Sequence, residues 1–120
     1  SGYEGERKDG KRHGQGKYFL KGNLDYEGEW KKDEHHGQGK YYLDGELLYE
    51  GEFKDGEWNG QGKDYNSEGE LRYEGGFKEG EYHGQGRRYD EGELQYLGGF
   101  KEGRFHGQGK EYYYEGEYFH

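Results

Sequence analysis

The feature that most constrains the fold is a motif that recurs along the whole chain. Tyr-x-Gly begins 23 or 24 residues apart, at Tyr3, Tyr26, Tyr49, Tyr73 and Tyr96. Gly-Gln-Gly recurs with the same spacing, beginning at Gly14, Gly37, Gly60, Gly84 and Gly107. A fixed period is typical of repeat arrays, in which each unit contacts its neighbours. We therefore expect a single domain, residues 1–120, with units 3–25, 26–48, 49–72, 73–95 and 96–120.

Each unit is predicted to contain two strands. Leu24, Tyr26, Gly28 and Trp30 alternate with acidic residues, and this period of two indicates a half-buried strand. Asp55-Gly56 supplies the positive φ of a tight turn before a second strand at 60–65, and a further turn is expected at Gly69. The predicted fold is all-β: a repeat array of antiparallel β-hairpins forming one elongated, twisted sheet about 50 Å long.

The apolar residues are mostly aromatic. Only 26% of the chain is hydrophobic and 38% is charged, which resembles a disordered sequence, but Tyr, Phe and Trp make up 19%. Each buried ring removes roughly 150–250 Å² from water. Glycines between the rings let a neighbouring ring lie on bare backbone. We expect a structural comb of eight rings: Tyr26, Trp30, Tyr49, Phe53, Tyr73, Phe77, Tyr96 and Phe100.

The end of the chain repeats part of the first-strand motif. Tyr114-Glu115-Gly116-Glu117 looks like the start of a sixth unit. Gly116, however, lies seven residues after Gly109, as Gly69 does after Gly62. Gly116 is therefore interpreted as the turn glycine that closes the fifth unit, in an aromatic terminal hairpin whose open edge could pair with another copy or a partner strand.

Composition also bears on origin and compartment. Ser1-Gly2 is interpreted as the remnant of a cleaved tag, and the thirteen-letter alphabet, without Ala, Val, Ile, Thr, Pro, Cys or Met, suggests an engineered or regularised sequence. No signal peptide and no stretch of 18 apolar residues is visible, so the location is unknown, with the cytoplasm favoured.

The sequence offers little for catalysis, metal binding or cofactor binding. The histidines before Gly-Gln-Gly are about 10 Å apart in the expected sheet, too far to share a zinc ion, and Asn59 replaces one of them. We assign them a hydrogen-bonding role at the turns: His13, His36, His83 and His106. Glu and Lys recur as an expected solvated cross-strand pattern, and no carboxylate pair stands out. We predict no catalytic residue, metal site or cofactor.

Net charge limits the partners. The formal charge of −9 makes nucleic acid an improbable partner, because such affinity depends on Lys and Arg neutralising phosphates. Anionic membrane lipid is disfavoured for the same reason. A basic or mixed-charge protein partner fits better.

The repeat resembles a known family. Tyr49-Glu50-Gly51-Glu52-Phe53-Lys54-Asp55-Gly56, followed by Asn59-Gly60-Gln61-Gly62, is similar to the MORN repeat (membrane occupation and recognition nexus). Segments such as 40–47 resemble the shorter bacterial variant found in antitoxin-labelled proteins. The resemblance implies a ladder of β-hairpins without catalytic activity that binds proteins, oligomerises or lies near membranes. Two positions depart from it: Arg7 replaces an aromatic residue, and Asp33 replaces glycine.

The departures suggest a binding surface. One position expected in the hairpin loops reads Arg12, His35, Trp58, Tyr82 and Phe105. Trp58, Tyr82 and Phe105 would form an aromatic ridge for a partner helix or peptide, or would fold back onto the sheet as packing. Leu97, Tyr112 and Tyr114 extend the candidate partner-binding surface.

The leading hypothesis is a scaffold that binds a protein or peptide partner through this aromatic surface, with edge-to-edge homodimerisation possible. The alternatives are a phospholipid-associated module, a toxin-neutralising partner, and a structural or designed array without ligand.

Overall fold

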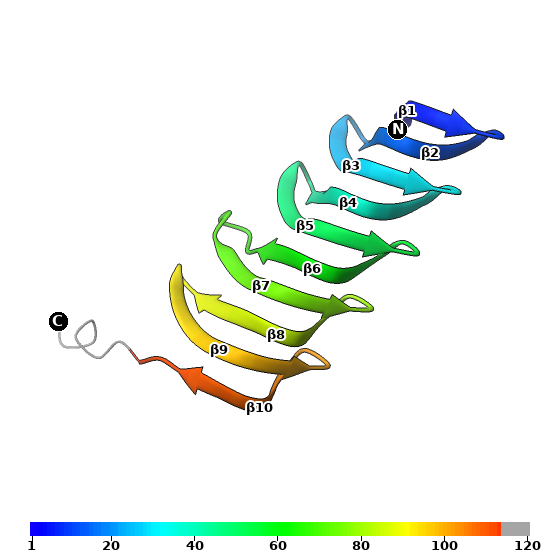
Figure 1. Ribbon diagram of the computed structural model, residues 1–120. Coiled ribbons are helices and arrows are strands. Elements are labelled where there is room, and N and C mark those ends of the chain that lie inside the picture. The colour runs from blue at the N-terminus through cyan, green and yellow to red at the C-terminus, as the bar shows by residue number, and fades with distance from the viewer. Residues whose placement is uncertain (114–120) are drawn as a thin grey trace.

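The computed structural model describes residues 1–113, which form one open antiparallel sheet whose strands follow chain order (Figure 1). The strands are β1 (Gly2–Lys8), β2 (Lys11–Leu20), β3 (Asn23–Lys31), β4 (Glu34–Leu43), β5 (Glu46–Lys54), β6 (Glu57–Tyr65), β7 (Leu71–Lys78), β8 (Glu81–Asp90), β9 (Glu93–Lys101) and β10 (Arg104–Glu111). The all-β hairpin array predicted from the period is therefore confirmed. Tyr114 and the turn expected at Gly116 lie outside the described residues.

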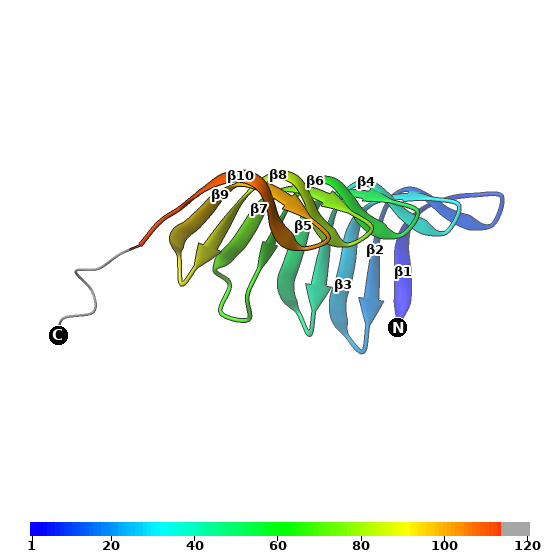
Figure 2. The same ribbon diagram turned by 90° about the horizontal axis from the view of Figure 1, so that it is seen from below.

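The sheet is long and bent. Its principal extents are 59 × 32 × 16 Å, close to the length expected from the spacing of hydrogen-bonded strands. Seen from below in Figure 2, the strands curve, so that the two rows of hairpin turns point in different directions. Nothing packs face to face against this single layer among residues 1–113, and the core must therefore lie on the sheet itself.

The turns follow the glycines. Asp55 and Gly56 have φ values of 51° and 82°, as a two-residue hairpin turn requires. The connection between β6 and β7 is longer, and this accounts for the spacing of 24 residues in the third unit. There the Asn66 side-chain oxygen accepts hydrogen bonds from the backbone N–H groups of Glu68 (2.9 Å) and Glu70 (3.0 Å).

The eight rings of the comb are the buried hydrophobic side chains of the described residues, with exposed fractions between 0% and 4%. Tyr49 shows the arrangement: its ring meets Phe53 of its own unit and Phe77 of the next unit edge-on, with ring centroids 5.1 and 5.0 Å apart. Its hydroxyl donates a hydrogen bond to the backbone oxygen of Glu52 (2.7 Å). Each ring therefore joins neighbouring units, so a unit is stable only within the array.

Glycine is required where the tyrosine crosses the backbone. A Cβ at Gly62 would collide with the Tyr49 hydroxyl, and a Cβ at Gly51 would lie 2.5 Å from the Cα of Gly62. Gly51 also has a φ of 150°, which side-chain-bearing residues rarely adopt. The paired glycines Gly51 and Gly62 therefore leave the space that the Tyr49 ring occupies, as expected from their alternation with aromatic residues.

Both departures from the repeat pattern have a structural reason. The Arg7 guanidinium lies over the Tyr3 ring, 5.0 Å from its centroid, in the first unit. Asp33 adopts a positive φ of 70°, as glycine would. Its carboxylate accepts hydrogen bonds from the backbone N–H (2.7 Å) and Nε (3.1 Å) of Arg12, and these bonds lower the pKa of Asp33.

Candidate functional site

The aromatic position expected in the hairpin loops lies instead in the strands. Trp58 is the second residue of β6, and Tyr82 and Phe105 occupy the same place in β8 and β10. Each ring stacks on a buried tyrosine: Trp58 on Tyr49 at 4.4 Å, Tyr82 on Tyr73 at 3.8 Å and Phe105 on Tyr96 at 3.9 Å. Of the two outcomes expected for these rings, the structure shows packing. The reason is register, because Trp58 lies directly opposite Phe53 and so points onto the comb.

Tyr82 is further held by a buried carboxylate that the sequence reading did not single out. Asp64 is 1% exposed and accepts hydrogen bonds from the Tyr82 hydroxyl (2.9 Å) and from Arg72 Nη2 (3.0 Å). Burial, and then the negative charge of Asp64, raise the pKa of Tyr82 to about 12. The repeat pattern could have indicated this residue, because Asp64 stands where the second strands of the first two units carry Tyr18 and Tyr41.

The opposite face of the sheet carries a long groove, which we call the polar groove. It encloses about 970 Å³ and crosses β3 to β9. A Cβ at Gly62 would point towards the Tyr49 ring, so the alternation of side chains places Gln61 and Lys63 on the other face. Glycine backbone, including Gly51 and Gly62, forms the floor of the groove, with Gln38, Gln61 and Gln85 along it.

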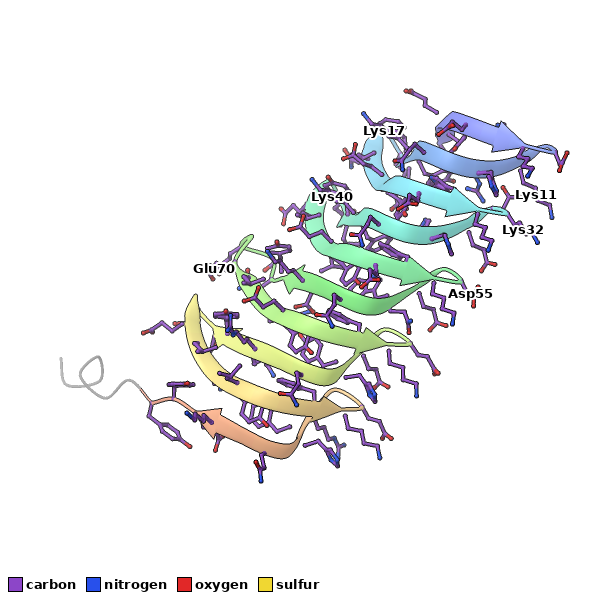
Figure 3. All side chains as sticks on the ribbon, in the orientation of Figure 1. Lys11, Lys17, Lys32, Lys40, Asp55 and Glu70 are labelled. Atoms are coloured by element: carbon purple, nitrogen blue, oxygen red, sulfur yellow. The ribbon has the colours of Figure 1, made fainter. Side chains whose placement is uncertain are left out.

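A row of mostly alternating charges, which we call the charge ladder, runs across the sheet, and its members from Glu27 to Leu97 line one wall of the polar groove. Successive strands place these residues directly opposite one another, in the order Glu4, Lys17, Glu27, Lys40, Glu50, Lys63, Glu74, Arg87, Leu97 and Lys110. Figure 3 labels Lys17 and Lys40, which lie at matching places in neighbouring hairpins. Ion pairs form at Lys17–Glu27 (3.8 Å) and Arg87–Glu74 (3.6 Å). The Glu–Lys pattern of the sequence thus becomes one continuous row.

Tyrosines brace the acidic members of the charge ladder. Tyr65 donates a hydrogen bond to Glu50 (2.6 Å), and Tyr89 donates one to Glu74 (2.8 Å). Burial, reinforced by Glu50, raises the pKa of the Tyr65 hydroxyl. The sequence reading missed these pairs, although a constant offset of 15 residues between carboxylate and tyrosine marks them. These hydrogen bonds hold the carboxylates of Glu50 and Glu74 in place along the groove wall.

The fifth unit changes this pattern. Leu97 replaces the carboxylate of the charge ladder and lines the end of the polar groove, half-buried. Tyr112, at the place of Tyr89, is 36% exposed. The predicted partner-binding residues are therefore divided: Leu97 lies in the groove, whereas Trp58, Tyr82 and Phe105 stack on the comb of the other face. Tyr114 lies outside the described residues.

Two side chains of the histidine series accept hydrogen bonds from the next turn, as the expected turn role requires. Lys32 N–H donates to His13 Nδ1 over a long 3.5 Å, and Glu79 N–H donates to Asn59 Oδ1 at 3.4 Å. Within residues 1–113, no three His, Cys, Asp or Glu side chains lie where they could share a metal ion. The same residues include no helix with the length and hydrophobicity of a membrane span.

The family comparison agrees with this geometry. A sequence model described as MORN repeat matches residues 3–23, 26–45, 49–63, 73–92 and 96–118, one match in each unit. No curated protein matches the chain. The MORN repeat forms non-catalytic modules that act as scaffolds or associate with membranes. The chain, with five matched hairpin units in one sheet, belongs to the MORN repeat family.

Proposed function

We propose that this chain is a scaffold that binds a segment of a partner protein along the polar groove. The supporting observation is the groove itself, which crosses seven strands from β3 to β9 and has an ordered wall. A site of this length fits a polypeptide segment better than a small molecule, because small-molecule sites are enclosed pockets that bury most of their ligand.

The charge ladder indicates the chemistry of the segment. Acidic and basic side chains alternate at the strand spacing of about 4.8 Å. A partner segment with side chains of both signs meets a complementary charge at each step, whereas a uniformly charged ligand meets repulsion at every second step. The glutamine amides supply both donors and acceptors for main-chain groups of the segment. At the far end, Leu97 adds an apolar contact.

The same pattern argues against lipid headgroups as the ligand. Along the polar groove, Lys40, Lys63 and Arg87 each lie beside a carboxylate, so no uninterrupted basic patch forms there. With a net charge of −9, the chain as a whole repels anionic membranes. Binding to vesicles is therefore the outcome that would oppose the proposal.

Photocrosslinking tests the proposal directly. Benzoylphenylalanine placed at Gln61 on the groove floor should capture one defined protein in cells of the source organism, identified by mass spectrometry. The matched control carries the crosslinker at Lys32, in an exposed turn. The captured protein is then purified, and its affinity is measured against the K63E/R87E variant, which we expect to bind at least tenfold more weakly.

Two results would contradict the proposal. Equal capture from Gln61 and from the control position would mean that the groove is not the contact surface. Sedimentation with vesicles of phosphatidylcholine and phosphatidylserine at low salt, lost on adding salt, would assign the surface to membranes instead.

A further inference from the structure

In the first three units, a glutamate of the first strand reaches a backbone N–H group of the second strand. Glu52 Oε2 accepts a hydrogen bond from the Gln61 N–H group at 2.5 Å. The two preceding units form the same bond, at 2.6 Å from Gln15 to Glu6 and at 2.7 Å from Gln38 to Glu29. The chain therefore places a carboxylate on this N–H group three times, and such charge-assisted hydrogen bonds are stronger than neutral ones.

A bulge in the second strand creates this arrangement. Glu52 of β5 stands opposite the three residues 59–61 of β6, so these residues leave the regular ladder on that side. Gly60, in the middle of the bulge, has a φ of 97°. A Cβ at Gly60 would lie only 2.7 Å from Oε2 of Glu52. The glutamate side chain thus fills the space inside the bulge that a strand partner would otherwise occupy.

The fourth and fifth units keep the bulge but lack the carboxylate. Gly76 and Gly99 stand at the position that Glu52 holds in the third unit. Three residues of the second strand still face one residue of the first. Gly84 and Gly107 keep left-handed φ values of 81° and 71°. The bulge backbone is therefore repeated without the side chain that fills it in the other units.

Open space remains at these two bulges. Beside Gly60, the direction of a Cβ is occupied by the Glu52 carboxylate, whereas a Cβ at Gly84 or Gly107 would meet no atom within 4 Å. Gly60 is accordingly half-buried, and Gly84 and Gly107 are exposed. The place that a carboxylate holds in the third unit is thus open in the fourth and fifth.

The first strand cannot fill this space from within the chain. A Cβ at Gly76 would collide with the backbone oxygen of His83, and a Cβ at Gly99 would collide with that of His106. The bulge backbone therefore lies directly against the bare first strand. A carboxylate that reaches the open side at Gly84 must come from another molecule.

The balance of charge on this face changes at the same point. Each of the first three units carries two glutamates and one lysine in the charge ladder and the bulge, as Glu50, Glu52 and Lys63 show. The fourth and fifth units together carry one glutamate and two cations at these positions: Glu74, Arg87 and Lys110. A carboxylate is therefore repelled over the first three units and attracted over the last two.

We propose that the N–H groups of Gln85 and Gln108 bind two carboxylates of the partner segment, in the place that the glutamates of the first three units hold. That the carboxylates belong to a polypeptide rests on the function proposed above. The two bulges are two strands apart, so the carboxylates lie about 10 Å apart. Gln85 and Arg87 line the polar groove. The segment therefore lies with its acidic end over the fourth and fifth units and its basic residues over the first three.

Acetate, a simple carboxylate, tests the site without the partner. In the full chain labelled with nitrogen-15, sodium acetate should move the amide protons of Gln85 and Gln108 downfield along a saturating curve, relative to sodium chloride at equal ionic strength. The amide of Gln61 should not respond, because Glu52 already accepts its hydrogen bond. A lack of saturating shifts at Gln85 and Gln108, or equal shifts at all three amides, would overturn the proposal.

One substitution converts an occupied bulge into an open one. Glu52→Gly gives the third unit the pattern of the fourth, and the Gln61 amide should then respond to acetate as Gln85 does. Glu50→Gln is the matched control, because it removes the same charge from the same strand and leaves the bond between Gln61 and Glu52. Circular dichroism checks that both variants retain the sheet. A Gln61 amide that stays unresponsive in Glu52→Gly would contradict the proposal.

Crosslink mapping tests the direction of the segment. Benzoylphenylalanine at Gln85 retains the backbone N–H group and should attach to an acidic stretch of the captured protein, whereas at Gln38 it should attach to a basic stretch. Attachment of both to one stretch, or the reverse order, would overturn this orientation. An acetate response without any captured protein would reject the scaffold function and keep the carboxylate site. Capture without an acetate response would keep the scaffold function and reject the site.

Discussion

At the scale of single residues, the units differ most where side chains meet the comb. The stacking position holds Arg12, His35, Trp58, Tyr82 and Phe105, all of which present a flat group. His35 stacks on Tyr26 with ring centroids 3.7 Å apart and planes within 2° of parallel. Burial lowers the pKa of His35 from 6.5 to about 4, so the folded protein holds this imidazole neutral.

The first prediction concerns the pH dependence that follows from His35. Below pH 6.5 the unfolded chain takes up a proton at this imidazole, while the folded chain resists protonation down to about pH 4. Stability is therefore lost as pH falls between these values, by about 1–2 kcal/mol once partial solvent exposure is allowed for. Urea unfolding at pH 7.5 and pH 4.5 measures the loss. His35→Phe, which places at this position the residue found at Phe105, should remove this part of the pH dependence of stability. An unchanged pH dependence in this variant would contradict the prediction.

The second prediction concerns the buried carboxylate. Asp64→Asn removes the negative charge that Arg72 and Tyr82 share, and we expect unfolding to become easier by about 1–3 kcal/mol. The pKa of Tyr82 should fall back towards 10, because the charge that helps to raise it is gone. Thermal unfolding and ultraviolet titration measure the two effects. Asp55→Asn, in an exposed turn, is the control and should change neither.

At the scale of the element, the hairpin is built around a glycine pair crossed by a tyrosine. Tyr49 cannot move to make room at Gly62, because Phe53, Phe77 and Trp58 enclose its ring and its hydroxyl is bonded to Glu52. The glycines of the repeat therefore do more than form turns: in each hairpin they also determine how close the core lies to the sheet.

A third prediction concerns this glycine pair. Gly62→Ala should destabilise the array by about 2–3 kcal/mol, since the added methyl group collides with a ring that has no free space. Gly2→Ala is the matched control, because a Cβ at Gly2 meets nothing within 4 Å. Chemical unfolding of both variants measures the difference. Similar stabilities for the two would show that the ring can shift after all.

At the scale of the whole molecule, backbone pairing runs only between strands that follow one another in the chain, across residues 1–113. The order from β1 to β10 follows the chain, and the ring contacts of the comb join neighbouring units: Tyr49, for example, touches Phe53 of its own unit and Phe77 of the next. An array of this kind behaves as a one-dimensional chain of coupled units, and its terminal units have one neighbour instead of two.

The fourth prediction is that the described sheet opens from its ends. Hydrogen exchange followed by mass spectrometry should find the slowest exchange in β5 to β8 and the fastest in β1 and β2, because the central units are covered on both sides. Uniform protection across all strands would show that the array opens as one cooperative unit.

Much of this fold could be read from the sequence. The 23-residue period, the alternation of rings and glycines, and the Asp-Gly turns each reflect local rules of strands and hairpins, so units, strands and comb were predictable. The stacking of Trp58 and Tyr82 was not decided by these rules. Whether these two rings project into solvent or pack on the comb depends on the hydrogen-bonding register. The register decides which residue lies opposite Phe53 or Phe77.

The sequence by itself determined that the chain is an array of hairpins with an aromatic core, because every unit repeats the same local pattern. Only the tertiary structure decided which side chains meet across strands: Asp64 with Tyr82, Tyr65 with Glu50, and the alternating residues of the charge ladder. The physical reason is that hydrogen-bonding register joins residues of different units, and a bulge that shifts it by one residue reverses which face a side chain occupies.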